Sequence, residues 1–130
     1  MKTSIIAFCV IIILSAVNVQ AQEITVSQLD FATAIENRGP VGIDSTFAST
    51  VGTVYCFTRI DGITDTTQIT HEWYYKDEEK ARIDLTVASD NWRTWSSKTI
   101  LESWTGPWRV MVVGANGNVL ATKNFVVTEN

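Results

Sequence analysis

The chain has 130 residues, with 10 Lys or Arg, 14 Asp or Glu and one His, and its formal net charge at pH 7 is −4. This length suits one domain and is too short for an α/β barrel or a two-halved dinucleotide-binding fold. The acidic balance argues against a nucleic-acid partner, because a phosphate backbone is bound by a basic face.

The first 21 residues have the parts of a secretory signal peptide. Residues 1–4 carry one positive charge, residues 5–17 are apolar, and a Val-Gln-Ala sequence precedes Gln22. The apolar run is shorter than the about 20 residues that a membrane-spanning helix needs. We therefore predict cleavage before Gln22, export to the periplasm or the extracellular space, and no integral membrane segment in the mature chain.

The mature part, residues 22–130, is predicted to form one all-β domain. Residues 22–49 are expected to be an N-terminal strand and loop segment, and residues 50–130 the β-sandwich body. Apolar and polar residues alternate in short segments that end at turn residues, and Asn116-Gly117 is a strong hairpin signal. The predicted strands are 29–35, 51–60, 67–75, 80–87, 92–100, 108–113 and 119–127.

Seven short strands of this kind predict an immunoglobulin-like antiparallel β-sandwich. A small open barrel is the alternative. The Cys…Trp…Cys signature of true immunoglobulin domains is absent, because Cys9 would leave with the signal peptide and only Cys56 remains. No intrachain disulfide is then possible, and Cys56 is predicted to be a buried apolar residue and not a reactive thiol.

Catalytic chemistry has little support in the sequence. His71 is the only histidine, and it alternates with Ile69 and Trp73, which predicts a half-buried structural side chain. The acidic run at residues 77–79 lies in a predicted turn, where it is a solvated tip. One His and one buried Cys do not make a zinc site. We expect no enzymatic activity, no metal and no cofactor.

Trp92 and Trp95 are three residues apart, which places them on opposite faces of a regular strand. One indole is then available as a stacking platform, and packing on both sides of the strand is the alternative. The alternation also places Tyr55, Phe57 and Tyr74 on outer faces. Such rings bind sugars or partner chains, unless residues 23–49 cover them.

Two arginines beside these aromatic residues are candidates for anion binding, Arg93 and Arg109. The alternative is that Arg93, Lys98 and Arg109 pair with Glu72 and Asp84 on neighbouring strands. The candidate binding residues are Tyr55, Tyr74, Arg93, Trp95 and Arg109.

Several runs along the chain resemble one bacterial family. They are Val-Tyr-Cys-Phe-Thr-Arg at 54–59, His-Glu-Trp-Tyr-Tyr at 71–75, Trp-Arg-Thr-Trp-Ser-Ser-Lys at 92–98 and Gly-Pro-Trp-Arg-Val at 106–110. In this order they are similar to the Domain of Unknown Function 2914 family, over residues 50–127. The resemblance implies an exported bacterial β-domain and assigns no catalytic residue.

These observations predict an exported, non-enzymatic binding or interaction module. Its expected partner is an envelope glycan or a protein, and its ligand is not specified by the sequence. A structural or assembly subunit that associates through strand edges is the alternative, and a hydrolase is a third, weaker one.

Overall fold

A computed structural model describes residues 23–129, and every regular element in this range is a β-strand. The predicted signal peptide with Cys9, and Gln22 after it, lie outside the described residues. The all-β prediction is confirmed. The chain forms ten strands and not about seven, because the first predicted strand is divided and two short strands are added.

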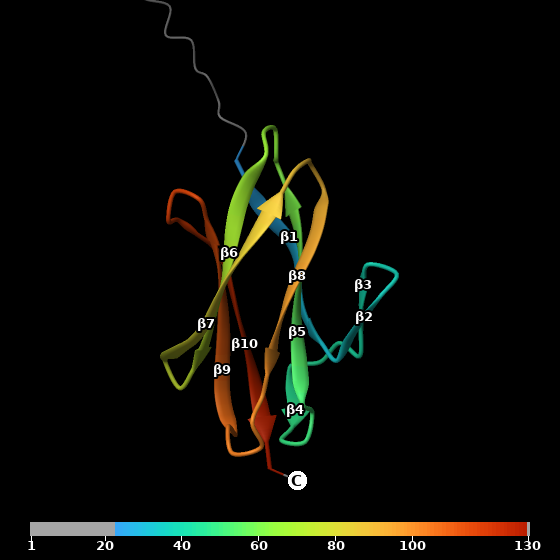
Figure 1. The fold of residues 1–130 in the computed structure, drawn as a ribbon, viewed down its shortest axis with the longest axis vertical. Coiled ribbons are helices and arrows are strands. Elements are labelled where there is room, and N and C mark those ends of the chain that lie inside the picture. The colour runs from blue at the N-terminus through green and yellow to red at the C-terminus, as the bar shows by residue number, and fades with distance from the viewer. Residues whose placement is uncertain (1–22, 130) are drawn as a thin grey trace, which may run out of the picture.

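Two sheets face each other as a sandwich, seen from the side in Figure 1. One sheet has three strands and the other has five, and neighbouring strands are antiparallel except β4 and β10, which are parallel. The three-stranded sheet has the order β1 (Thr25–Ala32), β5 (Thr53–Asp61) and β8 (Trp92–Thr99). The five-stranded sheet has the order β4 (Thr46–Ala48), β10 (Val119–Thr128), β9 (Gly106–Gly114), β6 (Thr67–Tyr75) and β7 (Glu78–Val87).

The connections repeatedly cross between the sheets. The chain passes from β5 to β6, back from β7 to β8, and again from β8 to β9. Crossings of this kind between two packed sheets are those of an immunoglobulin-like sandwich. Residues 23–49 contribute to both sheets, since β1 pairs with β5 and β4 pairs with β10.

A hairpin divides the first predicted strand. Its strands are β2 (Ala34–Glu36) and β3 (Gly39–Val41), and its turn residues Asn37 and Arg38 have φ angles of 50° and 60°. Two positive φ angles in a two-residue loop are typical of a type I′ turn, so the chain reverses tightly just after the predicted strand 29–35. Figure 1 shows the hairpin on the side of the three-stranded sheet that faces away from the other sheet.

The base of the hairpin requires a glycine. Gly42 has a φ angle of 71°, and a Cβ atom there would lie 2.1 Å from the Thr33 hydroxyl. Next to it, the Thr33 amide donates to the Val41 carbonyl at 3.0 Å. This close approach holds the hairpin against the end of β1.

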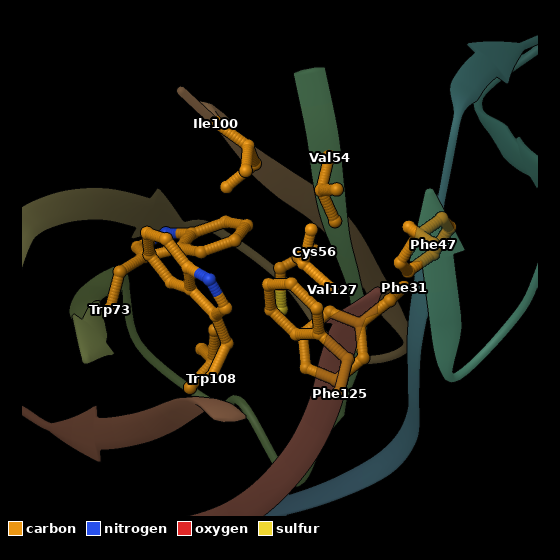
Figure 2. Packing of buried hydrophobic residues seen from close by; sticks show 10 residues of the cluster. Phe31, Phe47, Val54, Cys56, Trp73, Ile100, Trp108, Phe125 and Val127 are labelled. Carbon is orange, nitrogen blue, oxygen red and sulfur yellow. The ribbon is translucent and has the colours of Figure 1, made fainter. Parts of the chain in front are cut away.

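Aromatic side chains fill the core at one end of the sandwich (Figure 2). Phe31 and Phe125 come from different sheets, and their ring centres are 4.6 Å apart. Trp108 stacks on Phe125 at 5.7 Å, and Trp73 meets Phe125 edge-on at 6.1 Å. Cys56 is buried in the same cluster, as predicted. A second, aliphatic cluster fills the other end with Ile60, Ile63, Ile69, Val87 and Val112.

A chain of hydrogen bonds crosses the core between the two clusters. The Trp73 indole donates to the Ser96 hydroxyl at 3.1 Å, and the Ser96 hydroxyl lies 2.6 Å from His71 Nδ1. His71 Nε2 lies 3.2 Å from the Thr58 hydroxyl, which donates to the Thr94 carbonyl at 3.0 Å. Because Thr58 has one proton to give, it accepts from His71 Nε2–H, and Nδ1 therefore accepts from Ser96.

His71 is fully buried, which corrects the prediction that it is half-buried. It occurs on β6, and Ser96 and Thr58 occur on β8 and β5, so the hydrogen bonds join the two sheets. Burial lowers the pKa of His71 from 6.5 to about 4, because a charged imidazolium would lose its hydration in the core.

We predict a loss of stability in mild acid that depends on His71. The pKa is lower in the folded state than in the unfolded state, so the neutral imidazole favours folding above pH 6.5, and this contribution is lost as the pH falls to about 4. The expected size is about 3 kcal/mol. Denaturant unfolding of the wild type and of His71→Gln at several pH values measures it. A wild-type slope between pH 6.5 and 4 no steeper than that of the variant would contradict the prediction.

Candidate functional site

The predicted binding residues lie on two opposite faces of the sandwich. Tyr74 and Arg109 are direct cross-strand neighbours on β6 and β9, on the outer face of the five-stranded sheet. Tyr55, Arg93 and Trp95 occur on β5 and β8, at outward positions of the three-stranded sheet. The five residues therefore do not form one site, and each face is assessed by itself.

On the five-stranded sheet, the arginines are neutralised by carboxylates. Arg109 Nη1 lies 2.7 Å from Asp77 Oδ1, and its guanidinium lies 4.7 Å from the centre of the Tyr74 ring. The Tyr74 hydroxyl donates to Glu72 at 2.5 Å, and Glu72 pairs with Arg82 at 3.2 Å. Arg82 and Arg109 are thus each paired with a carboxylate of the same face. A hollow of about 340 Å³ lies beside Tyr74 and Arg109.

The alternative pairings predicted for Glu72 and Asp84 are wrong. Glu72 pairs with Arg82, and Asp84 accepts from the Thr70 hydroxyl at 2.7 Å. Topology separates Arg93 and Lys98 from these carboxylates, because β8 belongs to the other sheet. Arg109 is on β9, next to β6, but its guanidinium is held by Asp77. The cations named as their partners bind elsewhere: Arg93 to a carbonyl, Lys98 over the Trp104 ring and Arg109 to Asp77.

The outer face of the three-stranded sheet carries an aromatic pair. Phe57 and Trp95 are opposite each other in register, and their rings stack at 6.4 Å with an angle of 14°. Phe57 is 1% exposed, while Trp95 and Tyr55 remain partly exposed. Trp92 instead packs inward against the aliphatic cluster, which confirms that the two tryptophans lie on opposite faces.

Two arginines lie next to this pair without a carboxylate partner. Arg59 on β5 is directly opposite Arg93 on β8. Arg93 Nη1 reaches only the backbone carbonyl of Arg38, in the turn of the hairpin, at 3.4 Å. The Nε atom of Arg59 is buried and has no hydrogen-bond partner among the described residues. We call Arg59, Arg93 and Trp95 the arginine–tryptophan face, and the buried Phe57 ring lies beneath it against Trp95.

Arg59 was not among the predicted binding residues. The alternation that places Phe57 outward also places Arg59 outward, two positions later, so the strand pattern contained this signal. What the sequence does not indicate is that β8 lies next to β5 and brings Arg93 opposite it.

A polar hollow of about 690 Å³ continues from Arg59 along the same face. Its lining includes the hydroxyl and amide side chains of Thr25, Ser27, Gln28 and Asn91. Asp61 and Asp90 also line it, and Asp90 accepts a hydrogen bond from the Gly62 amide at 2.6 Å. The hollow therefore offers hydrogen-bond donors and acceptors and little apolar surface.

Within residues 23–129, the other reactive groups are enclosed. Cys56 is buried, and burial raises the pKa of its thiol far above the ordinary value. No group of three or more His, Cys, Asp or Glu side chains in this range is placed to hold a metal ion. No helix in the same range has the length and apolar character to cross a membrane.

We predict that Glu72 controls the ionisation of Tyr74. The hydrogen bond to Glu72 is the largest cause of the raised pKa of Tyr74, because ionisation of the phenol breaks this bond and brings two negative charges together. In Glu72→Gln the pKa of Tyr74 should fall toward 10. The ring Cζ chemical shift of Tyr74, followed against pH by NMR, measures it. Asp84→Asn on the same face is the control, and an unchanged Tyr74 pKa in Glu72→Gln would disprove the assignment.

Comparison with known proteins gives a family for part of the chain. The sequence model of the family described as "Protein of unknown function (DUF2914)" matches residues 66–127. The match includes three of the four runs quoted above and begins after the run at 54–59. No curated protein matches the chain.

Two solved structures are similar to this chain at a low level. They are a beta-glucosidase from Listeria innocua in complex with glucose and a beta-glucosidase from Listeria innocua, each 13% identical to the chain, with TM-scores of 0.45 and 0.44. The alignments cover 81% and 83% of this chain and 16% of each glucosidase chain. This chain therefore spans about one sixth of those proteins, and the likeness carries no information about activity. The family model thus supports the resemblance to the DUF2914 family of unknown function over residues 66–127, a shorter range than the expected 50–127.

Proposed function

We propose that the protein is an exported, non-enzymatic binding module that acts in the bacterial envelope or outside the cell. Its contact surface is the arginine–tryptophan face, together with Tyr55. The observation that carries the proposal is the pair Arg59 and Arg93, which have no carboxylate partner within residues 23–129 although the protein is acidic overall.

The contrast between the two outer faces supports this choice. Each arginine of the five-stranded sheet already has a carboxylate within 3.2 Å. A ligand that bound Arg109 would have to replace Asp77. On the arginine–tryptophan face, a partner meets guanidinium groups that are not neutralised and an indole that is partly exposed. Aromatic and arginine side chains together are typical of binding surfaces.

The enclosed positions of His71 and Cys56 support a role without catalysis. Both nitrogens of His71 are engaged in hydrogen bonds inside the core, and Cys56 packs among aromatic rings. A substrate at the surface does not reach a general base or a nucleophile that is buried in this way. At the β1 edge, an assembly role has less support, because Lys123 Nζ donates to the Leu29 carbonyl at 2.9 Å and occupies part of that edge.

The export part of the proposal predicts a processed protein. When the full chain is produced in a bacterium, the mature form should appear in the periplasm or the medium with Gln22 as its first residue. N-terminal sequencing and intact mass measure this, and the chain without residues 1–21 should remain in the cytoplasm. Recovery of only the unprocessed full chain from the cytoplasm would contradict export.

The proposal predicts that binding requires the arginine–tryptophan face and does not require the outer face of the five-stranded sheet. Tagged protein is mixed with the envelope and polysaccharide fractions of its source bacterium. The wild type should retain a glycan or a protein, and Arg93→Gln and Trp95→Ala should each retain at least tenfold less. Arg109→Gln and Tyr74→Ala, on the opposite face, should retain as much as the wild type.

Thermal unfolding of each variant separates lost binding from lost folding, and Arg93→Gln is the safer test because its side chain makes only one long hydrogen bond. Equal losses in the Arg109→Gln and Tyr74→Ala variants would move the contact to the five-stranded sheet. No retained component would disprove the binding module.

A further inference from the structure

We infer that the ligand of the arginine–tryptophan face is an acidic polysaccharide, with a uronic acid carboxylate between Arg59 and Arg93 and a sugar ring on Trp95. This inference rests on the proposed function and names the ligand class. It comes from one juxtaposition: two guanidinium groups without a carboxylate partner, beside a partly exposed indole, at the end of a polar hollow.

The arginine pair lacks an acceptor. Like charges directly opposite each other on neighbouring strands destabilise a sheet, and here neither arginine forms an ion pair among residues 23–129. Arg59 also keeps a buried Nε–H without a hydrogen-bond partner. A buried donor left unsatisfied is unfavourable, and a bound carboxylate would remove both the repulsion and the unsatisfied donor.

The geometry of a carboxylate matches that of the two guanidinium groups. The planar guanidinium presents parallel N–H groups that match the two oxygens of a carboxylate. The Arg38 carbonyl accepts one N–H of Arg93 and so holds that guanidinium near the hairpin. None of the aromatic–cation contacts within residues 23–129 involves Arg59 or Arg93, so the ring of Trp95 is not occupied by either guanidinium.

The position of Trp95 favours a sugar that carries the acid on its own ring. Trp95 and Arg93 are two residues apart on the same face of β8, about 7 Å along the strand. In a uronic acid the carboxylate is attached directly to the ring. A polyuronate chain that stacks one ring on the indole therefore brings a carboxylate, its own or that of the next sugar, toward the arginines.

The hollow beside Arg59 suits the rest of such a chain. Its lining side chains Ser27, Gln28 and Asn91 can exchange hydrogen bonds with sugar hydroxyls. A peptide partner would instead call for apolar pockets to hold its side chains. The polar lining thus favours a glycan over a protein as the ligand.

Acidic residues around the face limit the charge density of the ligand. Asp30 is engaged by Gln28 at 2.7 Å and by Lys123 at 3.6 Å, and Asp90 is engaged by the Gly62 amide. Glu23 and Asp61 also line the hollow, and Glu36 lies in the hairpin on the same side. These carboxylates repel a densely charged polyanion, whereas a polymer with one carboxylate per sugar can place its charge at the arginine pair alone.

Titration calorimetry with defined oligosaccharides tests the inference. The purified exported protein is titrated with an oligogalacturonate of six sugars and with a neutral glucose oligomer of the same length. The acidic oligomer should bind at least tenfold more tightly, and more weakly as the salt concentration rises. Arg59→Gln and Arg93→Gln should each weaken its binding at least tenfold, and Arg93→Lys should weaken it less. Arg109→Gln, in the neutralised network of the opposite face, should leave it unchanged.

Each other outcome overturns the inference in a distinct way. No binding of the acidic oligomer, or equal binding of the neutral one, excludes an acidic glycan. Competition by inorganic phosphate at the same concentration as the oligomer indicates a simple anion site. If Arg109→Gln weakens binding of the acidic oligomer as much as Arg59→Gln and Arg93→Gln do, the attraction is nonspecific. If the acidic oligomer does not bind while Arg93→Gln and Trp95→Ala each still lose capture of an envelope component, the inferred ligand class is wrong and the proposed binding module stands.

Discussion

The contact between the two sheets depends on one chain of hydrogen bonds through the core. Antibody domains join their sheets with a disulfide that packs against a buried tryptophan. Here the buried Trp73 is present on β6 and Cys56 lies in the same cluster on β5, but the central strand β9 of the opposite sheet contributes Val110. The link between the sheets is therefore the series from Trp73 through Ser96 and His71 to Thr58, in which every polar atom is satisfied. Aromatic packing on one side and aliphatic packing on the other keep water away from it.

This arrangement explains why the only histidine and the only cysteine of the described chain are structural. A network in which each donor has one acceptor specifies a single packing of the core, because any shift of one sheet leaves a buried polar atom without a partner. The same enclosure lowers the pKa of His71 and keeps its imidazole neutral near pH 7. The two outer faces, in contrast, differ in how their charges are satisfied.

The strand alternation in the sequence predicts which way a side chain points, and it does so correctly at several positions. It places Trp73 in the core, separates Trp92 from Trp95, and sets Tyr74 outside. It does not indicate which strands become neighbours. The alternation alone therefore groups Tyr74 with Trp95, although they lie on opposite sheets, and does not identify Arg82 as the partner of Glu72. The hairpin was missed for a local reason, since Asn37-Arg38 is a less common pair in a type I′ turn than Asn-Gly.

The arginine–tryptophan face also depends on strand pairing that the sequence pattern does not indicate. Arg59 and Arg93 are 34 positions apart in the chain, and only the pairing of β5 with β8 makes them direct neighbours. No carboxylate is brought to them by that pairing, while the pairing of β6 with β7 and β9 supplies one to each arginine of the other sheet. A folded chain satisfies most of its buried polar groups, and the exceptions concentrate where a partner completes them. The core is closed and the five-stranded face is neutralised, so among the described faces the arginine–tryptophan face is the one that keeps two arginines outside any ion pair and a buried donor without an acceptor.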